Sequence, residues 1–277
     1  MREIARDTTR RGGRVENVRQ YGSPPFGVVV VHGGPGAGGE MAPVARGLAS
    51  EHGVLEPIQT ATSLVGQVEE LKAVLEARGD PPLILVGFSW GAWLSFIVAA
   101  RYADLVEKLV LVGCGPFQEG YVATLHETRL ERFSTEERRM FDATVEALND
   151  PDTEDKDRLL ARLGALARKS DSYDPITNPD ERSDEVGPAG HIFQKVWKEA
   201  AELRRNGTLL QLGREVQCPV VAVHGDYDPH PSEGVRIPLT STLDDFRFVL
   251  LQNCGHKPWI ERQARDAFYR VLRRELS

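Results

Sequence analysis

Cysteine is scarce in this chain of 277 residues, which contains only Cys114, Cys218 and Cys254. The three form an odd set with no C-x-x-C spacing, so neither a disulfide framework nor a cysteine-ligated zinc site is indicated. Free thiols are typical of reducing compartments. We therefore expect a cytoplasmic protein without a structural metal.

Long apolar runs are also missing. No stretch approaches the roughly 20 apolar residues that a membrane-spanning helix needs. The N-terminal sequence MREIARDTTRRGG lacks the apolar core of a signal peptide. The sequence thus predicts neither a membrane partner nor export by that route.

The chain has no surplus of positive charge. Its 34 Lys and Arg residues are outnumbered by 41 Asp and Glu residues, which gives a net charge of -7. A partner with a phosphate backbone requires a basic surface, so a nucleic-acid partner is not expected. The local exception, Arg10, Arg11 and Arg14, is interpreted as a solvated N-terminus.

What the chain does have is a regular alternation of apolar runs and helical patterns. Continuous β-branched runs such as FGVVVVH are typical of strands buried on both faces. The alternation predicts an α/β fold with a mostly parallel sheet, right-handed crossovers and flanking helices. The expected strands lie at 26–32, 54–58, 81–88, 107–113, 218–225 and 246–252, and the expected helices at 40–50, after a capping Ser63, at 90–102 and at 259–276.

The composition shifts between about residues 116 and 215, where the chain is polar and charge-rich, with helical runs and no buried strand. We interpret 116–215 as a helical cap inserted into one α/β core formed by 1–115 and 216–277. Within the cap, segment 170–188 is dense in Asp, Ser and Pro, which predicts a loop.

The pentapeptide Gly87-Phe88-Ser89-Trp90-Gly91 fits G-x-S-x-G and joins a predicted buried strand to a predicted helix. That context favours a nucleophile elbow, in which a serine occupies a strained turn and flanking glycines avoid clashes. A plain strand-to-helix turn with a capping serine is the alternative.

The segment His32-Gly33-Gly34-Pro35-Gly36 follows the first predicted strand. A glycine-rich turn at this place is able to direct a backbone N–H at a developing oxyanion. We assign Gly34 as one donor and Trp90, directly after the serine, as the other. Gly33 and His32 are expected to support this turn. A tight turn without this role remains the alternative.

A serine hydroxyl needs an imidazole to take its proton. Among the histidines, His256 follows the last strand, at the carboxyl end of the sheet, where open α/β sheets place their sites. His52, His126, His191 and His224 are expected to have packing or solvated roles. The imidazole in turn needs an acid, and the loop 224–228 offers Asp226 and Asp228. We favour Asp228, which is farther into the loop, and expect Asp226 to brace the turn.

Together these residues resemble the α/β-hydrolase superfamily, in which the triad follows the chain order of Ser89, Asp228 and His256. The H-G-G-P-G segment and Ser89-Trp90-Gly91 resemble the prolyl iminopeptidase branch more narrowly. Those enzymes usually carry D-x-R-G-x-G-x-S after the next strand, where this chain has E-P-I-Q-T-A-T-S at 56–63. That departure favours another acyl hydrolase over an aminopeptidase.

The expected function is a serine hydrolase that cleaves a small acyl ester or amide through an acyl-enzyme, without a cofactor. A short peptide substrate, and thus a prolyl iminopeptidase-type activity, is the alternative; a non-catalytic small-ligand-binding protein is a third reading. An aminopeptidase must bind a free amine, but the cap acids Glu199 and Glu202 are explained as surface charges of helix 195–205. Phe117, Phe193 and Trp197 are expected either to line an apolar pocket or to pack the cap.

Overall fold

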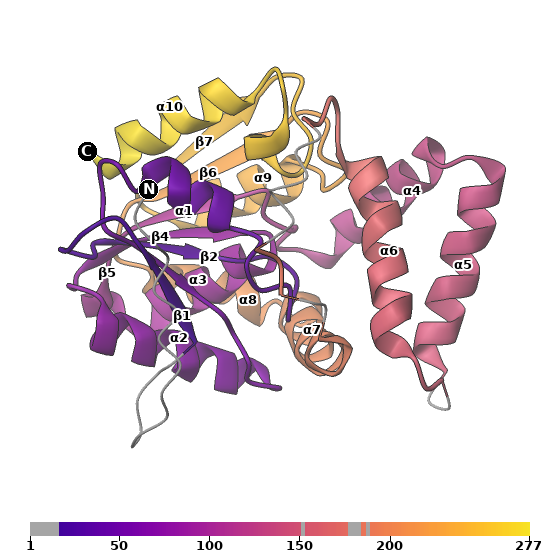
Figure 1. Ribbon diagram of the computed structural model, residues 1–277, viewed down its shortest axis with the longest axis horizontal. Helices are drawn as coiled ribbons and strands as arrows, with labels where there is room; N and C mark the ends of the chain where they lie inside the picture. Colours follow the sequence, from indigo (N-terminus) through magenta and orange to yellow (C-terminus); the bar gives the residue numbers. More distant parts are fainter. Residues whose placement is uncertain (1–16, 151–152, 177–183, 187–188) are drawn as a thin grey trace.

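Seven strands form one sheet in the order β1-β3-β2-β4-β5-β6-β7, in which β1 is antiparallel and the other neighbours are parallel (Figure 1). The computed structural model describes residues 17–150, 153–176, 184–186 and 189–277. Arg10, Arg11 and Arg14 lie outside these ranges, as do positions 177–183 and 187–188 of the predicted loop. The strands are β1 Val18–Tyr21, β2 Val28–Val31, β3 Val54–Pro57, β4 Leu83–Phe88, β5 Val106–Val112, β6 Val220–Gly225 and β7 Phe246–Leu251.

Helices cover both faces of the sheet (Figure 1). Because side chains alternate along a strand, Val29 and Val31 of β2 pack in the cluster with α2 and α3. Val28 and Val30 pack in the cluster with α1 and α10 on the other face. These helices are α1 Ala42–Leu48, α2 Leu64–Arg78, α3 Trp90–Arg101, α9 Glu233–Thr242 and α10 Arg265–Leu276, with short 3-10 turns η1 Ala103–Leu105 and η5 Pro258–Ile260. None of the helices in the described ranges has the length and apolar character needed to cross a bilayer.

The segment between β5 and β6 is helical, and its described part contains no named strand. Helices α4, α5 and α6 project to one side of the sheet, whereas α7 and α8 lie beneath it (Figure 1). Val196 and Ala200 of α7 are buried in the core cluster of α2 and α3. The division into a core and a cap at 116 and 215 stays a prediction. The elements are η2 Glu119–Tyr121, α4 Val122–Arg132, α5 Thr135–Asn149, α6 Lys156–Asp171, α7 Gly190–Arg205, α8 Thr208–Gln211 and η4 Leu212–Glu215.

Three elements differ from the sequence-based expectation. Strand β1 is short and half polar, so it lacks the apolar run by which the other strands were found; Tyr21 binds Glu56 of β3 through its hydroxyl at 2.7 Å. Helix α9 contains Pro238, which obscures its helical pattern. The last helix was expected from 259, but the buried Glu261 carboxylate accepts hydrogen bonds from the backbone N–H groups of Tyr173, Asp174 and Gly255. The chain therefore turns there and α10 begins at Arg265.

Candidate active site

Ser89 stands between the end of β4 and the start of α3. Its φ of 51° and ψ of -113° are strained for serine, and Asn253 is the other described non-glycine residue with a positive φ. Strain of this kind costs on the order of 1–3 kcal/mol and concentrates at functional sites. A Cβ at Gly87 would lie 2.3 Å from the carbonyl oxygen of Gly91, and one at Gly91 would lie 2.2 Å from that of Val31. The turn thus requires both glycines and leaves Ser89 half-buried at the carboxyl end of the sheet.

The glycine-rich turn 32–36 follows β2, the strand next to β4, so it lies at the same edge of the sheet as Ser89. Gly34 has a φ of 33° and Gly36 a φ of 89°, and the N–H of Ala37 donates to the carbonyl of Gly34 at 2.9 Å. A Cβ at Gly33 would lie 2.6 Å from Oε2 of Glu40. The assignment of the Gly34 and Trp90 N–H groups to an oxyanion stays a prediction.

His32 ties this turn to the segment after β3. Its Nδ1 lies 2.8 Å from the carbonyl oxygen of Gly33, so Nδ1 carries the proton and donates. Its Nε2 accepts the backbone N–H of Gln59 at 3.3 Å. Burial lowers the pKa of His32. The ring is therefore neutral and has no free nitrogen for proton transfer, which leaves the base to another histidine.

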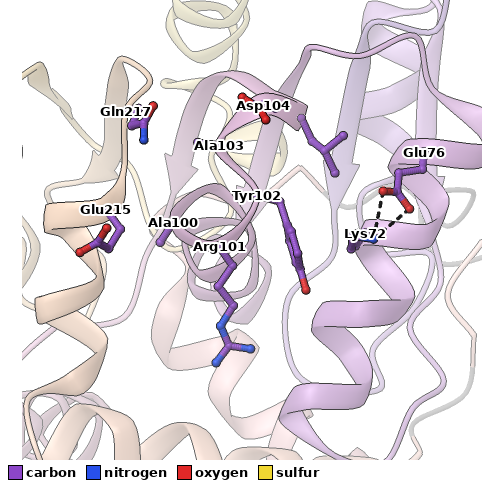
Figure 2. A pocket seen from close by; sticks show the side chains of 10 residues that line it. Lys72, Glu76, Ala100, Arg101, Tyr102, Ala103, Asp104, Glu215 and Gln217 are labelled. Carbon is purple, nitrogen blue, oxygen red and sulfur yellow. Dashed lines mark hydrogen bonds and ion pairs between the residues drawn. The ribbon is translucent and has the colours of Figure 1, made fainter.

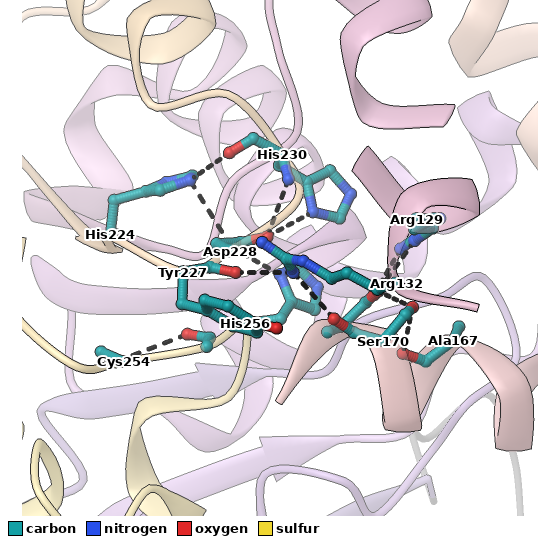
Figure 3. Close-up of polar contacts among 12 residues, drawn as sticks. Arg129, Arg132, Ala167, Ser170, His224, Tyr227, Asp228, His230, Cys254 and His256 are labelled. Atoms are coloured by element: carbon teal, nitrogen blue, oxygen red, sulfur yellow. Dashed lines mark hydrogen bonds and ion pairs between the residues drawn. The ribbon is translucent and has the colours of Figure 1, made fainter. Parts of the chain in front are cut away.

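The loop after β6 brings an acid to the loop after β7 (Figure 3). Oδ2 of Asp228 lies 2.7 Å from Nδ1 of His256, and the Asp228 side chain is fully buried. Asp226 points elsewhere: its Oδ1 accepts the backbone N–H of Cys254 at 3.0 Å. Asp228, and not Asp226, thus contacts His256. Because the carboxylate accepts at Nδ1, Nε2 of His256 holds the free lone pair that a general base needs.

Two more histidines surround the same carboxylate (Figure 3). Nδ1 of His230 lies 2.7 Å from Oδ1 of Asp228, and the His230 backbone N–H donates to the same oxygen at 2.9 Å. Nε2 of His224 contacts the carbonyl of His230 at 2.8 Å and lies 3.5 Å from Oδ2 of Asp228. His224, expected only to pack or be solvated, is thus part of this cluster. No pattern singled out His230; its position two residues after Asp228 is the one signal that would have found it.

Burial and hydrogen bonding oppose each other at this cluster. Burial tends to raise the pKa of Asp228, but His256, His230 and His224 together lower it well below its usual value. Burial lowers the pKa of His230 to about 4. Asp228 is therefore ionised and His230 neutral at pH 7. Asp228, His230 and His256 also form a group whose potential ligand atoms lie within 4.8 Å of one another. Hydrogen bonds join Asp228 to the Nδ1 atoms of both rings in this group.

Comparison with known proteins places this geometry in a family. A model of the α/β-hydrolase fold matches residues 28–263. The chain belongs to the α/β-hydrolase fold family. Both the predicted fold and the predicted class of enzyme, a hydrolase, are confirmed at this level.

Solved structures of similar fold cover almost all of this α/β-hydrolase, whereas no curated protein sequence matches it. VinJ has a TM-score of 0.69 and 19% identity, with 94% of this chain and 93% of VinJ covered. The proline iminopeptidase of Mycobacterium smegmatis has a TM-score of 0.65 and 19% identity, covering 94% and 93%. The enol-lactonase of Burkholderia xenovorans LB400 has a TM-score of 0.58 and 18% identity, covering 94% and 95%. At these identities the likeness establishes the fold.

The helices α4 and α6 of this α/β-hydrolase contact the loops after β6 and β7, which carry Asp228 and His256 (Figure 3). The loop after β7 is called the histidine loop below. The carbonyl of Asp171, at the end of α6, accepts the backbone N–H of His256 at 2.7 Å. Arg132 of α4 donates to the carbonyls of Ser170 and Tyr227 at 2.7 and 2.9 Å, and its guanidinium lies 3.6 Å from the centre of the Tyr227 ring. These helices therefore hold both loops that carry the acid and the histidine.

A half-buried ion pair joins the glycine-rich turn to the loop after β7, which carries His256. Nζ of Lys257 contacts Oε1 of Glu40, and each side chain is 14% exposed. Burial alone would raise the pKa of Glu40, but Lys257 lowers it below its usual value. Because Glu40 faces Gly33 and Lys257 follows His256, the pair fixes these two segments relative to each other.

The cap residues expected to bear on substrate choice all have structural partners. Glu199 accepts the N–H of Leu64 at 2.7 Å and so caps α2, and Glu202 pairs with Arg205. Trp197 stacks on Trp93 with ring centres 5.7 Å apart. Phe117 is fully buried, and Phe193 stacks on Trp197. Among the described contacts, Trp197 and Phe193 thus pack α7 onto the core, and each acid has one structural contact.

A hollow of about 430 Å³ lies at the far end of α3 and is lined by residues that include Lys72, Glu76 and Tyr102 (Figure 2). Helix α3 has 12 residues, so this hollow lies about 18 Å from the turn of Ser89. In this hollow Lys72 pairs with Glu76, and the Tyr102 hydroxyl donates to Glu69. We therefore do not assign it to the hydrolase site.

Proposed function

We propose that this hydrolase cleaves small acyl esters or amides through a covalent acyl-enzyme on Ser89. The observation that carries the proposal is the 2.7 Å contact between Asp228 and Nδ1 of His256, at the same edge of the sheet as the strained turn of Ser89. That contact fixes the tautomer in which Nε2 of His256 is free to accept a proton. His32, the other histidine at this edge of the sheet, is not the base in this proposal, because both of its ring nitrogens already form hydrogen bonds.

In the proposed reaction, Nε2 of His256 removes the proton of Ser89 as Oγ bonds to the substrate carbonyl carbon. The carbonyl oxygen takes the negative charge and accepts hydrogen bonds from the N–H groups of Gly34 and Trp90. The proton then passes from His256 to the leaving group, whose bond to carbon breaks. Water, deprotonated by His256, attacks the acyl carbon, and the carboxylic acid and Ser89 are released.

An ester or amide substrate without a free amine is favoured over an N-terminal peptide. Prolyl iminopeptidases usually carry D-x-R-G-x-G-x-S where this chain has E-P-I-Q-T-A-T-S at 56–63. The cap acids Glu199 and Glu202 contact the N–H of Leu64 and the side chain of Arg205, respectively. Cytoplasmic location remains part of this proposal, and the three free cysteines support it.

A fluorophosphonate probe tests the nucleophile. We expect the wild-type protein to be labelled and Ser89→Ala to be unlabelled, with Ser50→Ala, an exposed serine, as the matched control that retains labelling. Undiminished labelling of Ser89→Ala would refute the assignment. Turnover of p-nitrophenyl acetate against proline p-nitroanilide then separates the acyl hydrolase from the aminopeptidase, and a panel of lactones and amides narrows the acyl group.

A further inference from the structure

Asp228 serves two imidazoles at once, and the second one has no part in the proposed reaction. Its two oxygens are divided between them: Oδ2 accepts from Nδ1 of His256 and Oδ1 from Nδ1 of His230, both at 2.7 Å. The rings of His230 and His256 also stack, with centres 4.4 Å apart and planes inclined by 22°. The ring of His256 therefore packs against a neutral imidazole as well as against the ring of Phe88.

The hydrogen bonds fix the protonation of each ring. An ionised carboxylate only accepts, so both Nδ1 atoms that face Asp228 carry protons. His224 donates its Nε2 proton to the carbonyl of His230, which holds the backbone of that residue as well. His230 is thus fixed at its ring, its N–H and its carbonyl. A side chain fixed at three points is suited to setting the position of the group that it contacts.

We infer that His230 is a positioning residue, which holds the carboxylate of Asp228 in place for His256 and shares its negative charge. The inference rests on the proposed function of His256. The Nδ1–H of His230 binds the carboxylate of Asp228 and so competes with His256 for its negative charge. Without that donor, the carboxylate favours protonated His256 more strongly. The acid limb of the pH profile then moves to higher pH.

Other titratable or charged groups also face this cluster, and the test leaves all of them in place. They are Glu40 beside the glycine-rich turn, Lys257 after His256, Arg129 and Asp171 from α4 and α6, His224 from β6, and Cys114 after β5. Any change in the pH profile between variants at position 230 therefore reports on that side chain.

Three variants separate the hydrogen bond from the ring. His230→Asn keeps a donor near the place of Nδ1 but has no ring, His230→Phe keeps the ring but has no donor, and His230→Ala has neither. We expect the acid limb of kcat/KM for p-nitrophenyl acetate to move up by about half a pH unit or more in the Phe and Ala variants. The Asn variant is expected to keep the wild-type midpoint of the acid limb. In the Phe and Ala variants, we expect kcat to fall by a larger factor than the factor by which KM changes. His191→Asn, at an exposed position of α7, is the matched control.

A titration that needs no substrate distinguishes failure of this inference from failure of the proposed function. The ring ¹⁵N chemical shifts of His256, followed by NMR against pH in the full chain, report the midpoint of its titration. This measurement works even if the protein has no activity. Equal midpoints in wild type and His230→Phe, or equal displacement in His230→Asn and His230→Phe, would overturn the inference. If His230→Phe does not fold, the Asn and Ala pair provides the same comparison.

Discussion

Arg129 of α4 binds Asp171 at the end of α6 through two N–H groups, one to each carboxylate oxygen, with Nε 2.9 Å from Oδ1. The backbone carbonyl of the same Asp171 accepts the N–H of His256. Arg129 of α4 is therefore linked to the proposed base His256 through a single residue, Asp171 of α6.

Arg129→Gln is expected to lower kcat/KM for an ester about tenfold, since a displacement worth about 1.4 kcal/mol in the transition state has that effect. Replacing Arg129 leaves the nearly buried Asp171 carboxylate without its charged partner and loosens the hydrogen bond to His256. The effect should lie in kcat. Arg139→Gln, at an exposed site on α5, removes the same charge and should retain wild-type rates. Equal rates in both variants would show that α4 does not act on the site.

Gly91→Ala is expected to destabilise the protein by about 2 kcal/mol or more, because its new Cβ overlaps the carbonyl oxygen of Val31 at 2.2 Å. Gly164→Ala is the matched control within α6, where an added Cβ meets nothing within 4 Å. It should stabilise by about 0.5–1 kcal/mol through helix propensity. Urea unfolding measures both. Changes of the same sign would contradict the close packing at the elbow.

Most strands of the sheet and several of its helices could be predicted because short stretches of their sequences carry clear apolar or capping patterns. The run of four valines at 28–31 can only be buried on both faces, and Ser63 caps α2 as expected, accepting the N–H of Gly66 at 3.1 Å. Strand β1 was not predictable, because its residues are half polar and it is defined by pairing with β3, far along the chain. The sequence pattern thus identifies the strands that carry an apolar run and misses the strand that does not.

Some residues of the candidate site could likewise be predicted from local sequence, and others could not. Ser89 and the glycine-rich turn were found from short motifs, and Asp228 was preferred from its place in the loop. His230 was not predicted, because its contact with Asp228 depends on how the loop folds back on its own carboxylate; its position two residues after Asp228 is the one signal in the sequence. The contacts of Arg129 and Arg132 could not be predicted either, because their partners Asp171 and Tyr227 lie 42 and 95 residues away in the sequence.

Stability should depend on pH through His230. Its pKa is about 4 in the folded chain and 6.5 as an unperturbed group, so unfolded chains bind a proton between these values that folded chains do not. The stability contribution is present above pH 6.5 and is lost as the pH falls to about 4, by at most roughly 3 kcal/mol. His230→Asn lacks this proton uptake. Urea unfolding from pH 7.5 to 4 should give a flatter curve for the variant, and parallel curves would contradict the shift.

Lys257→Met is expected to destabilise the protein by about 2 kcal/mol, because it leaves the half-buried Glu40 carboxylate without its charged partner. Glu40→Gln combined with Lys257→Met removes both charges and should regain at least half of that loss, so a double-mutant cycle reveals the coupling. Since Lys257 lowers the pKa of Glu40, the coupling should be present at neutral pH and fade as the pH falls through the folded pKa of Glu40. Additive effects of the two changes at pH 7 would mean that the pair does not join the glycine-rich turn to the histidine loop.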